Sequence, residues 1–227
     1  MKYATYGVNR LSFTDKIVVK KRLEIVSIIN SLIRENNLIS CLDIGTTSDE
    51  RIESSNIVVK LLKGLKIKKS LSNQDISINL FDKIFKKSIT NDFTQKEINK
   101  LSSDLVLSIA TIEHVGNFKN QKKMLENIVK MTDQYFVFTT PNRYFPIDFH
   151  AKLPFLHWLP KSIHRFVLKT INLRYFSYEQ NLNLLSKNDL ETILKFKNVY
   201  YTIKKIKLFG LTSNFLVIGK IIKNENI

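Results

Sequence analysis

Residues 41–49 read Cys-Leu-Asp-Ile-Gly-Thr-Thr-Ser-Asp. An apolar run that ends in Asp and Gly is typical of a buried parallel strand turning tightly into a helix. A second apolar run, Leu105-Val-Leu-Ser-Ile109, leads into Ala110-Thr-Ile-Glu-His-Val115. In an open α/β sheet, two such turns lie side by side where the strand order reverses, and ligands bind there. The two stretches therefore predict a ligand site at the carboxyl edge of a parallel sheet.

Apolar periodicity extends this prediction over the rest of the chain. It predicts helices over 14–36, 51–62 and 120–131, and strands over 38–44, 65–71, 83–89, 105–109 and 135–140. Ser186-Lys-Asn-Asp189 has the pattern of a helix N-cap. The β-rich runs 198–209 and 214–222, separated by Gly210-Leu-Thr-Ser213, predict a terminal antiparallel hairpin. We therefore expect a doubly wound, mostly parallel, seven-stranded α/β sheet with a C-terminal antiparallel hairpin.

Composition indicates a globular protein of one domain. The chain has 227 residues, of which 44% are hydrophobic and 25% charged, which is enough to bury a core. No apolar run is long enough to span a bilayer, and residues 1–10 lack the apolar core of a signal peptide. The single Cys41 excludes an intramolecular disulfide and a cysteine-based zinc site. We expect a cytoplasmic location.

The net charge of +16 is compatible with nucleic acid, an anionic membrane surface or an acidic substrate as partner. The chain is, however, rich in Lys, Ile and Asn throughout, and its basic residues form no arginine-rich arm. They are scattered over Lys20-Lys21-Arg22, Lys66–Lys69, Lys86-Lys87, Lys122-Lys123 and Lys204-Lys205. We interpret the charge mainly as a composition bias and predict no specific nucleic-acid partner.

A third unusual stretch covers residues 139–160, Thr-Thr-Pro-Asn-Arg-Tyr-Phe-Pro-Ile-Asp-Phe-His-Ala-Lys-Leu-Pro-Phe-Leu-His-Trp-Leu-Pro. All four prolines and the only tryptophan lie in it. The prolines restrict the backbone, and the aromatic residues offer an apolar wall. Because the stretch follows a predicted strand, we expect it to arch over the ligand site.

These three stretches together resemble class I S-adenosylmethionine (SAM)-dependent methyltransferases, in particular a type 11-like small-molecule subgroup with a TPNRxFP…HWLP segment. The resemblance implies a Rossmann-like methyltransferase fold and SAM as the cofactor. It implies a single domain with four parts: an N-terminal helical cap (1–37), a cofactor-binding half (38–142), an acceptor-side lid (143–185), and a C-terminal helix and hairpin (186–227). A nicotinamide oxidoreductase is excluded because Gly45 stands alone, without the Gly-x-Gly-x-x-Gly turn.

The resemblance also assigns the cofactor contacts. They are Asp43, Gly45 and Thr46 at the first turn, Ser72, Asn73 or Asp75 at the ribose, Asp92 and Phe93 at the adenine, and Ala110 and Thr111 below the methionine and sulfonium. Relatives carry more glycine in the first turn, where this chain has Thr46, Thr47 and Ser48. A chain of this fold that has lost SAM binding, and acts as a non-catalytic binding protein, is therefore an alternative.

On the acceptor side, His150 and His157 are the candidate bases for a hydroxyl acceptor, with Asp148 orienting one of them. The predicted acceptor-binding residues are His114, as a positioning residue, Arg143, for an acidic group, and Tyr144, Phe145 and Trp158. Asp148, His150 and His157 also form a set that suits a divalent ion, but packing alone explains them as well, and we predict no metal.

The predicted reaction is in-line methyl transfer to a small-molecule or lipid- or glycan-linked acceptor. An RNA methyltransferase is the other alternative, supported by the charge but not by a separate RNA-binding module. Exposed aromatic residues near lysines are also compatible with peripheral membrane contact. The sequence assigns no oligomeric state.

Overall fold

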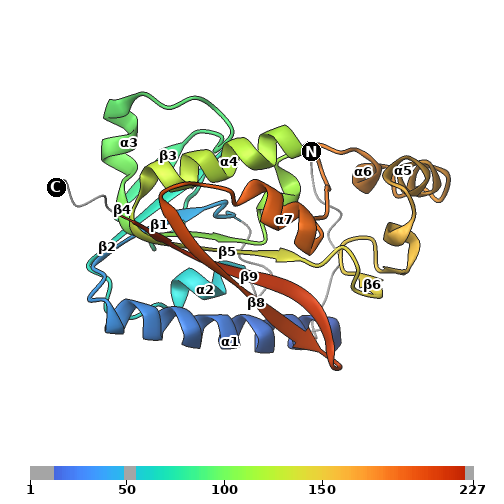
Figure 1. Ribbon diagram of the computed structural model, residues 1–227, viewed down its shortest axis with the longest axis horizontal. Helices are drawn as coiled ribbons and strands as arrows, with labels where there is room; N and C mark the ends of the chain where they lie inside the picture. Colours follow the sequence, from blue (N-terminus) through green and yellow to red (C-terminus); the bar gives the residue numbers. More distant parts are fainter. Residues whose placement is uncertain (1–12, 49–54, 223–227) are drawn as a thin grey trace.

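The computed structural model describes residues 13–48 and 55–222, and their centre is a seven-stranded sheet (Figure 1). The strands are β1 (Ser40–Ile44), β2 (Ile67–Ser72), β3 (Lys83–Lys86), β4 (Ser103–Ile109), β5 (Thr132–Pro141), β8 (Val199–Leu208) and β9 (Leu211–Ile221), in the order β3-β2-β1-β4-β5-β9-β8. β1 to β5 are parallel, whereas β9 is antiparallel to both β5 and β8. The predicted sheet and hairpin are confirmed. The strand order reverses between β1 and β4, which is where a ligand site is expected.

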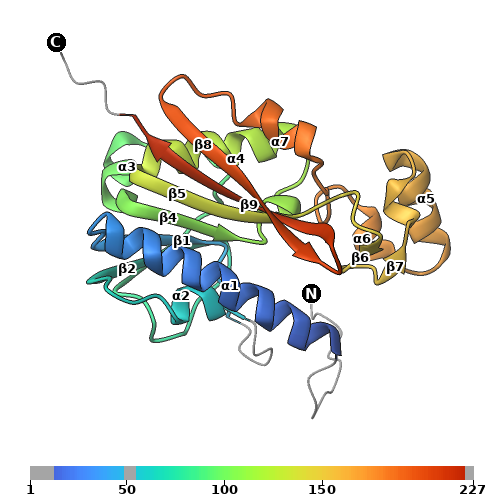
Figure 2. The same ribbon diagram turned by 60° about the horizontal axis from the view of Figure 1, so that its bottom comes forward.

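Helices cover both faces of the sheet (Figures 1 and 2). α1 (Phe13–Glu35) and α2 (Ile57–Lys60) lie on one face, and α3 (Gln95–Leu101), α4 (Phe118–Met131) and α7 (Lys187–Ile193) on the other. None of the helices within the described ranges is long and apolar enough to cross a membrane.

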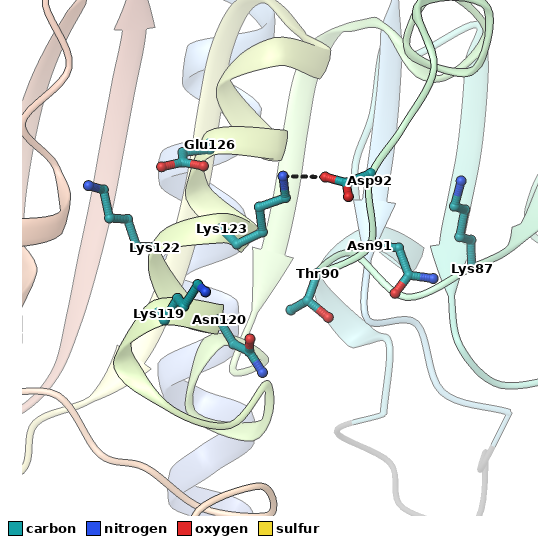
Figure 3. Close-up of a pocket in the computed structure, with 9 residues that line it drawn as sticks. All are labelled: Lys87, Thr90, Asn91, Asp92, Lys119, Asn120, Lys122, Lys123 and Glu126. Atoms are coloured by element: carbon teal, nitrogen blue, oxygen red, sulfur yellow. Dashed lines mark hydrogen bonds and ion pairs between the residues drawn. The ribbon is translucent and has the colours of Figure 1, made fainter.

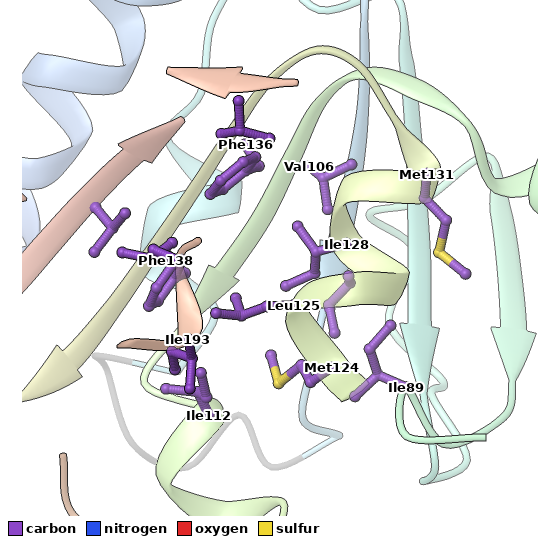
Figure 4. Packing of buried hydrophobic residues seen from close by; sticks show 14 of the residues in the cluster. Ile89, Val106, Ile112, Met124, Leu125, Ile128, Met131, Phe136, Phe138 and Ile193 are labelled. Carbon is purple, nitrogen blue, oxygen red and sulfur yellow. The ribbon is translucent and has the colours of Figure 1, made fainter. Parts of the chain in front are cut away.

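Alternating strand residues feed two separate cores. Leu105 and Leu107 of β4 pack on the α1 side, while Val106 between them packs against α4. Figure 4 shows the α4 side, where Phe136 and Phe138 of β5 face Leu125 and Ile128. A strand that is buried on both faces needs a continuous apolar run. For this reason β4 and β5 could be predicted from the sequence.

The structure corrects several predicted element boundaries. β3 ends at Lys86 instead of Ile89, and the helix predicted over 51–62 is helical only at Ile57–Lys60, with 51–54 outside the described residues. α3 was not predicted, although Thr94 and Glu97 form a capping box at its start. The terminal turn consists of Phe209 and Gly210 alone, so β9 begins at Leu211.

The 143–185 segment leaves the sheet at the carboxyl end of β5 (Figure 2). It contains a small hairpin of β6 (Ile147–Asp148) and β7 (Leu153–Pro154), the 3-10 turn η2 (Leu156–Trp158), α5 (Lys161–Thr170) and α6 (Arg174–Ser177). Another 3-10 turn, η1 (Ile112–His114), follows β4. The segment therefore lies at the same edge of the sheet as the turns that follow β1 and β4.

Candidate functional site

A cleft of about 650 Å³ opens at the carboxyl edge of the sheet. We call it the edge cleft. Its lining comes from the ends of β1, β2 and β4, from the residues after β3, and from the 143–185 segment, and includes Gly45, Thr46, Ser72, Asn73, Ser88, Thr90, Ala110, Thr111, His114, His150, Tyr175 and Phe176. Five parts of the chain thus meet in one cavity, at the place predicted from the strand order.

Gly45 makes the turn after β1 possible. Its φ of 88° lies in the left-handed region, and a Cβ atom there would collide with the side chain of Thr111. The Gly45 amide donates a hydrogen bond to the carbonyl of Leu71 (3.0 Å). The glycine therefore fits β1 against the turn after β4, a role in the fold that the sequence-based cofactor assignment had not included.

Hydroxyl groups replace the missing glycines in this turn. Thr46 donates a hydrogen bond from Oγ1 to Oδ2 of Asp43 (2.6 Å) and accepts one from Oγ of Ser70 (2.8 Å). Ser72 donates from Oγ to the carbonyl of Thr46 (2.8 Å). Burial raises the pKa of Asp43 to about 6, and the hydrogen bond from Thr46 acts in the opposite direction. The Thr46 hydroxyl therefore donates and accepts its hydrogen bonds at the turn.

Asp43 does not line the edge cleft. It lines a neighbouring cavity of about 260 Å³ on the other side of the turn, with Arg22, Gly45 and Ala110. Ala110 has a φ of 53°, which is unusual for a residue with a side chain. Its amide donates to both the carbonyl and Oγ1 of Thr139. This conformation directs the chain from β4 along the cleft.

Besides Asp43, three more of the predicted cofactor contacts lie away from the edge cleft. Asp75 is exposed and pairs with Lys86 (2.6 Å). Phe93 lies beneath the ammonium group of Lys87, 4.5 Å from the ring centroid. Asp92 has a side chain that is 94% exposed and pairs with Lys123 (2.6 Å).

Figure 3 shows Asp92 in a neighbouring groove of about 900 Å³, which shares only Lys87 and Thr90 with the edge cleft and which we call the lysine groove. The displacement of Asp92 and Phe93 from the edge cleft has a simple cause. Because β3 ends at Lys86, the residues at its carboxyl end are Ser88 and Thr90, and these two line the edge cleft instead.

His150 is the predicted base that does line the edge cleft. Its ring meets that of His114 edge to face, with centroids 5.0 Å apart, and its Nδ1 donates to Oδ1 of Asp148 (3.2 Å). Burial alone would lower the pKa of His150, but the bond to Asp148 and the charges of Glu113 and Asp148 raise it. Burial acts upward on the pKa of Asp148, yet the contacts with His150 hold it below the ordinary value. The Asp148 carboxylate thus contacts the ring of one of the two histidines for which the sequence had suggested it.

Glu113 was missed as a site residue by the sequence reasoning. It is 0% exposed, its Oε2 accepts a hydrogen bond from Oγ1 of Thr140 (3.2 Å), and its Oε1 has no hydrogen-bond partner among the described residues. The neighbouring His114 donates from Nδ1 to the carbonyl of Asn181 (2.7 Å). A glutamate immediately after a buried strand was the available signal.

Apart from His114, the other predicted acceptor residues do not line the edge cleft, and most of them make contacts within the 143–185 segment. His157 is 2% exposed and donates from Nε2 to the carbonyl of Phe145 (2.7 Å), which also accepts from Trp158 (3.3 Å). Arg143 donates to the carbonyls of His157 and Leu159. Tyr144 is exposed. The segment faces the cleft through five residues, of which the sequence had pointed only to the first: His150, Tyr175, Phe176, Gln180 and Asn181.

Comparisons with known proteins identify the fold. No protein-family model matches the sequence, and no curated protein does. Among solved structures, magnesium protoporphyrin IX methyltransferase from Synechocystis PCC 6803 with bound SAH matches with a TM-score of 0.55 and 11% identity, over 95% of this chain and 90% of that one. The N-methyltransferase NodS from Bradyrhizobium japonicum WM9 matches with a TM-score of 0.54 and 10% identity, over 92% and 99%. The small RNA methyltransferase HEN1 gives 0.60 and 12%, over 97% of this chain but 27% of that one. The chain thus has the Rossmann-like fold of SAM-dependent methyltransferases.

Proposed function

We propose that the chain is a SAM-dependent methyltransferase that binds SAM in the edge cleft. The observation that carries the proposal is the cleft itself, in which the Gly45 turn, the end of β2 and the end of β4 open into one space with the 143–185 segment. A donor and an acceptor bound in one cavity can be aligned for in-line transfer. The volume of about 650 Å³ is in the usual range for a pocket that encloses a ligand of this size.

The polar groups of the edge cleft fit the cofactor from end to end. Ser88 and Thr90 would face the adenine, Asn73 the ribose, and the backbone of Gly45 and Thr46 the methionine part, with Ala110 and Thr111 beside it. When bound, SAM supplies a methyl group on a sulfonium, so the electrophile needs no activation by the protein. The protein must position the acceptor and exclude water.

The acceptor end of the cleft lies under the 143–185 segment. Tyr175 and Phe176 offer apolar surface there, beside His114 and His150. This combination suits a small-molecule acceptor, free or linked to a lipid or glycan, with an aromatic or aliphatic part next to a polar nucleophile. Of the two histidines suggested as bases, only His150 lies on the cleft, so acceptor activation centres on His150 and His114.

Calorimetric titration with SAM and with SAH tests the proposal. We expect one site per chain. Asn73→Trp should weaken binding at least tenfold, because Asn73 is exposed at the cleft and the larger side chain fills ligand space without disturbing the core. Asp92→Ala is the matched control and should bind as the parent does, because Asp92 lies in the lysine groove. No binding of either compound would overturn the proposal and favour a non-catalytic binding protein.

An RNA acceptor is the second candidate, and the lysine groove is the observation that favours it. Lys87, Lys119, Lys122 and Lys123 line the groove (Figure 3), although Asp92 and Glu126 offset part of their charge. Binding that depends only on phosphate contacts should be weak and should fall steeply with added salt. Nanomolar binding of a particular RNA at physiological salt, lost in Lys119→Glu, would establish the second candidate over the first.

A further inference from the structure

We propose that Glu113, His114 and His150 form a binding site for a divalent transition-metal ion at the acceptor end of the edge cleft. Each of the three side chains offers one ligand atom, and these atoms lie within 4.8 Å of one another. Glu113 and His114 come from η1, directly after β4, whereas His150 comes from the loop between β6 and β7. The fold thus brings together residues that are far apart in the sequence.

The buried carboxylate of Glu113 is the first indication of a cation. Its Oε1 is buried and accepts no hydrogen bond from residues 13–48 or 55–222. Arg22 attracts Glu113 electrostatically, but no bond to Oε1 results. A buried carboxylate oxygen without a partner is costly and in native proteins usually marks a missing ion or water. Oε1 is therefore the atom of Glu113 that an ion would satisfy.

The imidazoles of His114 and His150 are oriented by hydrogen bonds in the way that is usual for histidines that bind a metal ion. The carbonyl of Asn181 can only accept, so His114 carries its proton on Nδ1 and keeps the Nε2 lone pair. His150 likewise donates from Nδ1 to Asp148, which leaves its own Nε2 lone pair. Histidine ligands characteristically donate their other ring N–H to a carbonyl or carboxylate, which fixes the ring and raises its basicity. Asn181 and Asp148 provide this support.

The donor set selects the class of ion. Two imidazole nitrogens and one carboxylate oxygen suit manganese, iron, cobalt, nickel or zinc better than magnesium or calcium. Ligand atoms about 2.1 Å from a tetrahedral ion lie about 3.4 Å apart, so atoms that now lie within 4.8 Å of one another would have to approach by at most about 1.4 Å. Three protein ligands leave further positions open toward the cleft, as in catalytic metal sites.

The role of the ion, unlike its binding, rests on the proposed function. An ion at this place can bind the oxygen of a hydroxyl acceptor and lower its pKa. The hydroxyl proton then leaves to solvent, and the oxygen–methyl bond forms as the sulfonium–methyl bond breaks. His150 would serve as a ligand and not as a base, since both roles require the Nε2 lone pair. The proposal replaces our prediction of no metal, and it excludes His157, whose Nε2 bonds to Phe145.

Metal titrations of the full chain, stripped with a chelator, test the site. We expect one Co²⁺ per chain, with a visible ligand-field band, and one Mn²⁺ with nitrogen couplings in its electron paramagnetic resonance signal. His114→Ala should weaken Co²⁺ binding at least about 100-fold. Its side chain is exposed, so the variant should fold. Asp148→Asn should weaken binding about 10- to 100-fold, as the loss of a supporting carboxylate does.

His164→Ala is the matched control, because His164 lies in α5 outside the set. It should bind Co²⁺ as the parent does. Substoichiometric binding by the parent, or equal Co²⁺ affinity in the parent and His114→Ala, would overturn the site. SAM titration of the metal-free protein separates the two proposals. If SAM binds but the metal ion does not, only the metal site is overturned. If the metal ion binds but SAM does not, only the SAM site is overturned.

Discussion

The ring of His150 meets the ring of His114 edge to face at 5.0 Å between centroids. One histidine follows β4 at the centre of the sheet, and the other belongs to the 143–185 segment beyond β5. The contact ties the segment to the edge cleft, together with the hydrogen bonds from His114 to the carbonyl of Asn181 (2.7 Å) and from the amide of Asn183 to the carbonyl of Glu113 (2.8 Å). Whatever the pair binds, the site is complete only when the segment is in place.

Gly45→Ala should destabilise the fold. The residue would hold a side chain at a φ of 88° and push against Thr111, at a cost of about 2 to 4 kcal/mol. Urea unfolding gives the change in free energy. A Thr111→Ala background removes the two nearest atoms but keeps the Cβ at 3.0 Å. There the same substitution should cost less, close to the backbone part of about 1 to 2 kcal/mol. Equal costs in the two backgrounds would show that Thr111 does not confine Gly45.

Ala110→Gly should leave the protein as stable as the parent, or more stable by up to about 1 kcal/mol. Glycine removes the penalty of a left-handed alanine, which exceeds the entropy that glycine adds to the unfolded chain. Ala151 has no positive φ, so Ala151→Gly is the control and should lower stability in the same thermal unfolding experiment. If Ala110→Gly lowered the stability as much as Ala151→Gly does, the expectation would be contradicted.

Asp43→Asn should change how stability depends on pH. Burial raises the folded-state pKa of Asp43 from 3.8 to about 6, so the folded chain keeps a proton that the unfolded chain releases. The parent should lose stability as pH rises from about 4 to about 6, by about 3 kcal/mol in total from this group. Asp43→Asn should lack this slope.

The measurement is the difference in unfolding free energy between parent and Asp43→Asn at several pH values. Histidines and other carboxylates cancel in that difference. A difference that is constant between pH 4 and pH 7 would mean that Asp43 titrates normally.

Phe209→Asn should stabilise the β8–β9 hairpin by about 0.5 to 1 kcal/mol. Phe209 and Gly210 both have positive φ, and a two-residue turn of this kind favours Asn-Gly. Phe209 is 78% exposed, so little packing is lost. Phe209→Ala keeps the left-handed penalty and should give no gain, which makes it the control in thermal unfolding.

Much of the fold was predictable because the buried strands are continuous apolar runs. Ile89 shows the limit of this reasoning. It is buried in the core beside α4, so it extended the apolar pattern of β3, but it lies beyond the last hydrogen-bonded residue of that strand. A core position need not be a strand position. The predicted adenine contacts Asp92 and Phe93 were placed by their distance before β4, and both lie outside the lining of the edge cleft.

The acceptor side was predicted only in part, since it depends on contacts between distant segments. The proline-rich stretch contains His150 and His157, and nothing local shows that only His150 lines the cleft. The partners that complete the site, Tyr175 and Asn181, lie in a later stretch without an unusual composition. The sequence did not single out Glu113, because burial on every side cannot be seen in a short motif.

The position of β9 affects how the chain folds during synthesis. β9 is made last of the seven strands, yet it fills the place between β5 and β8. Until the ribosome has released residues 211–221, β5 has an unpaired edge, and β8 has no neighbour in the sheet. Open edges of this kind promote association between chains. We therefore expect nascent chains that stall after β8 to be the forms that aggregate and bind chaperones.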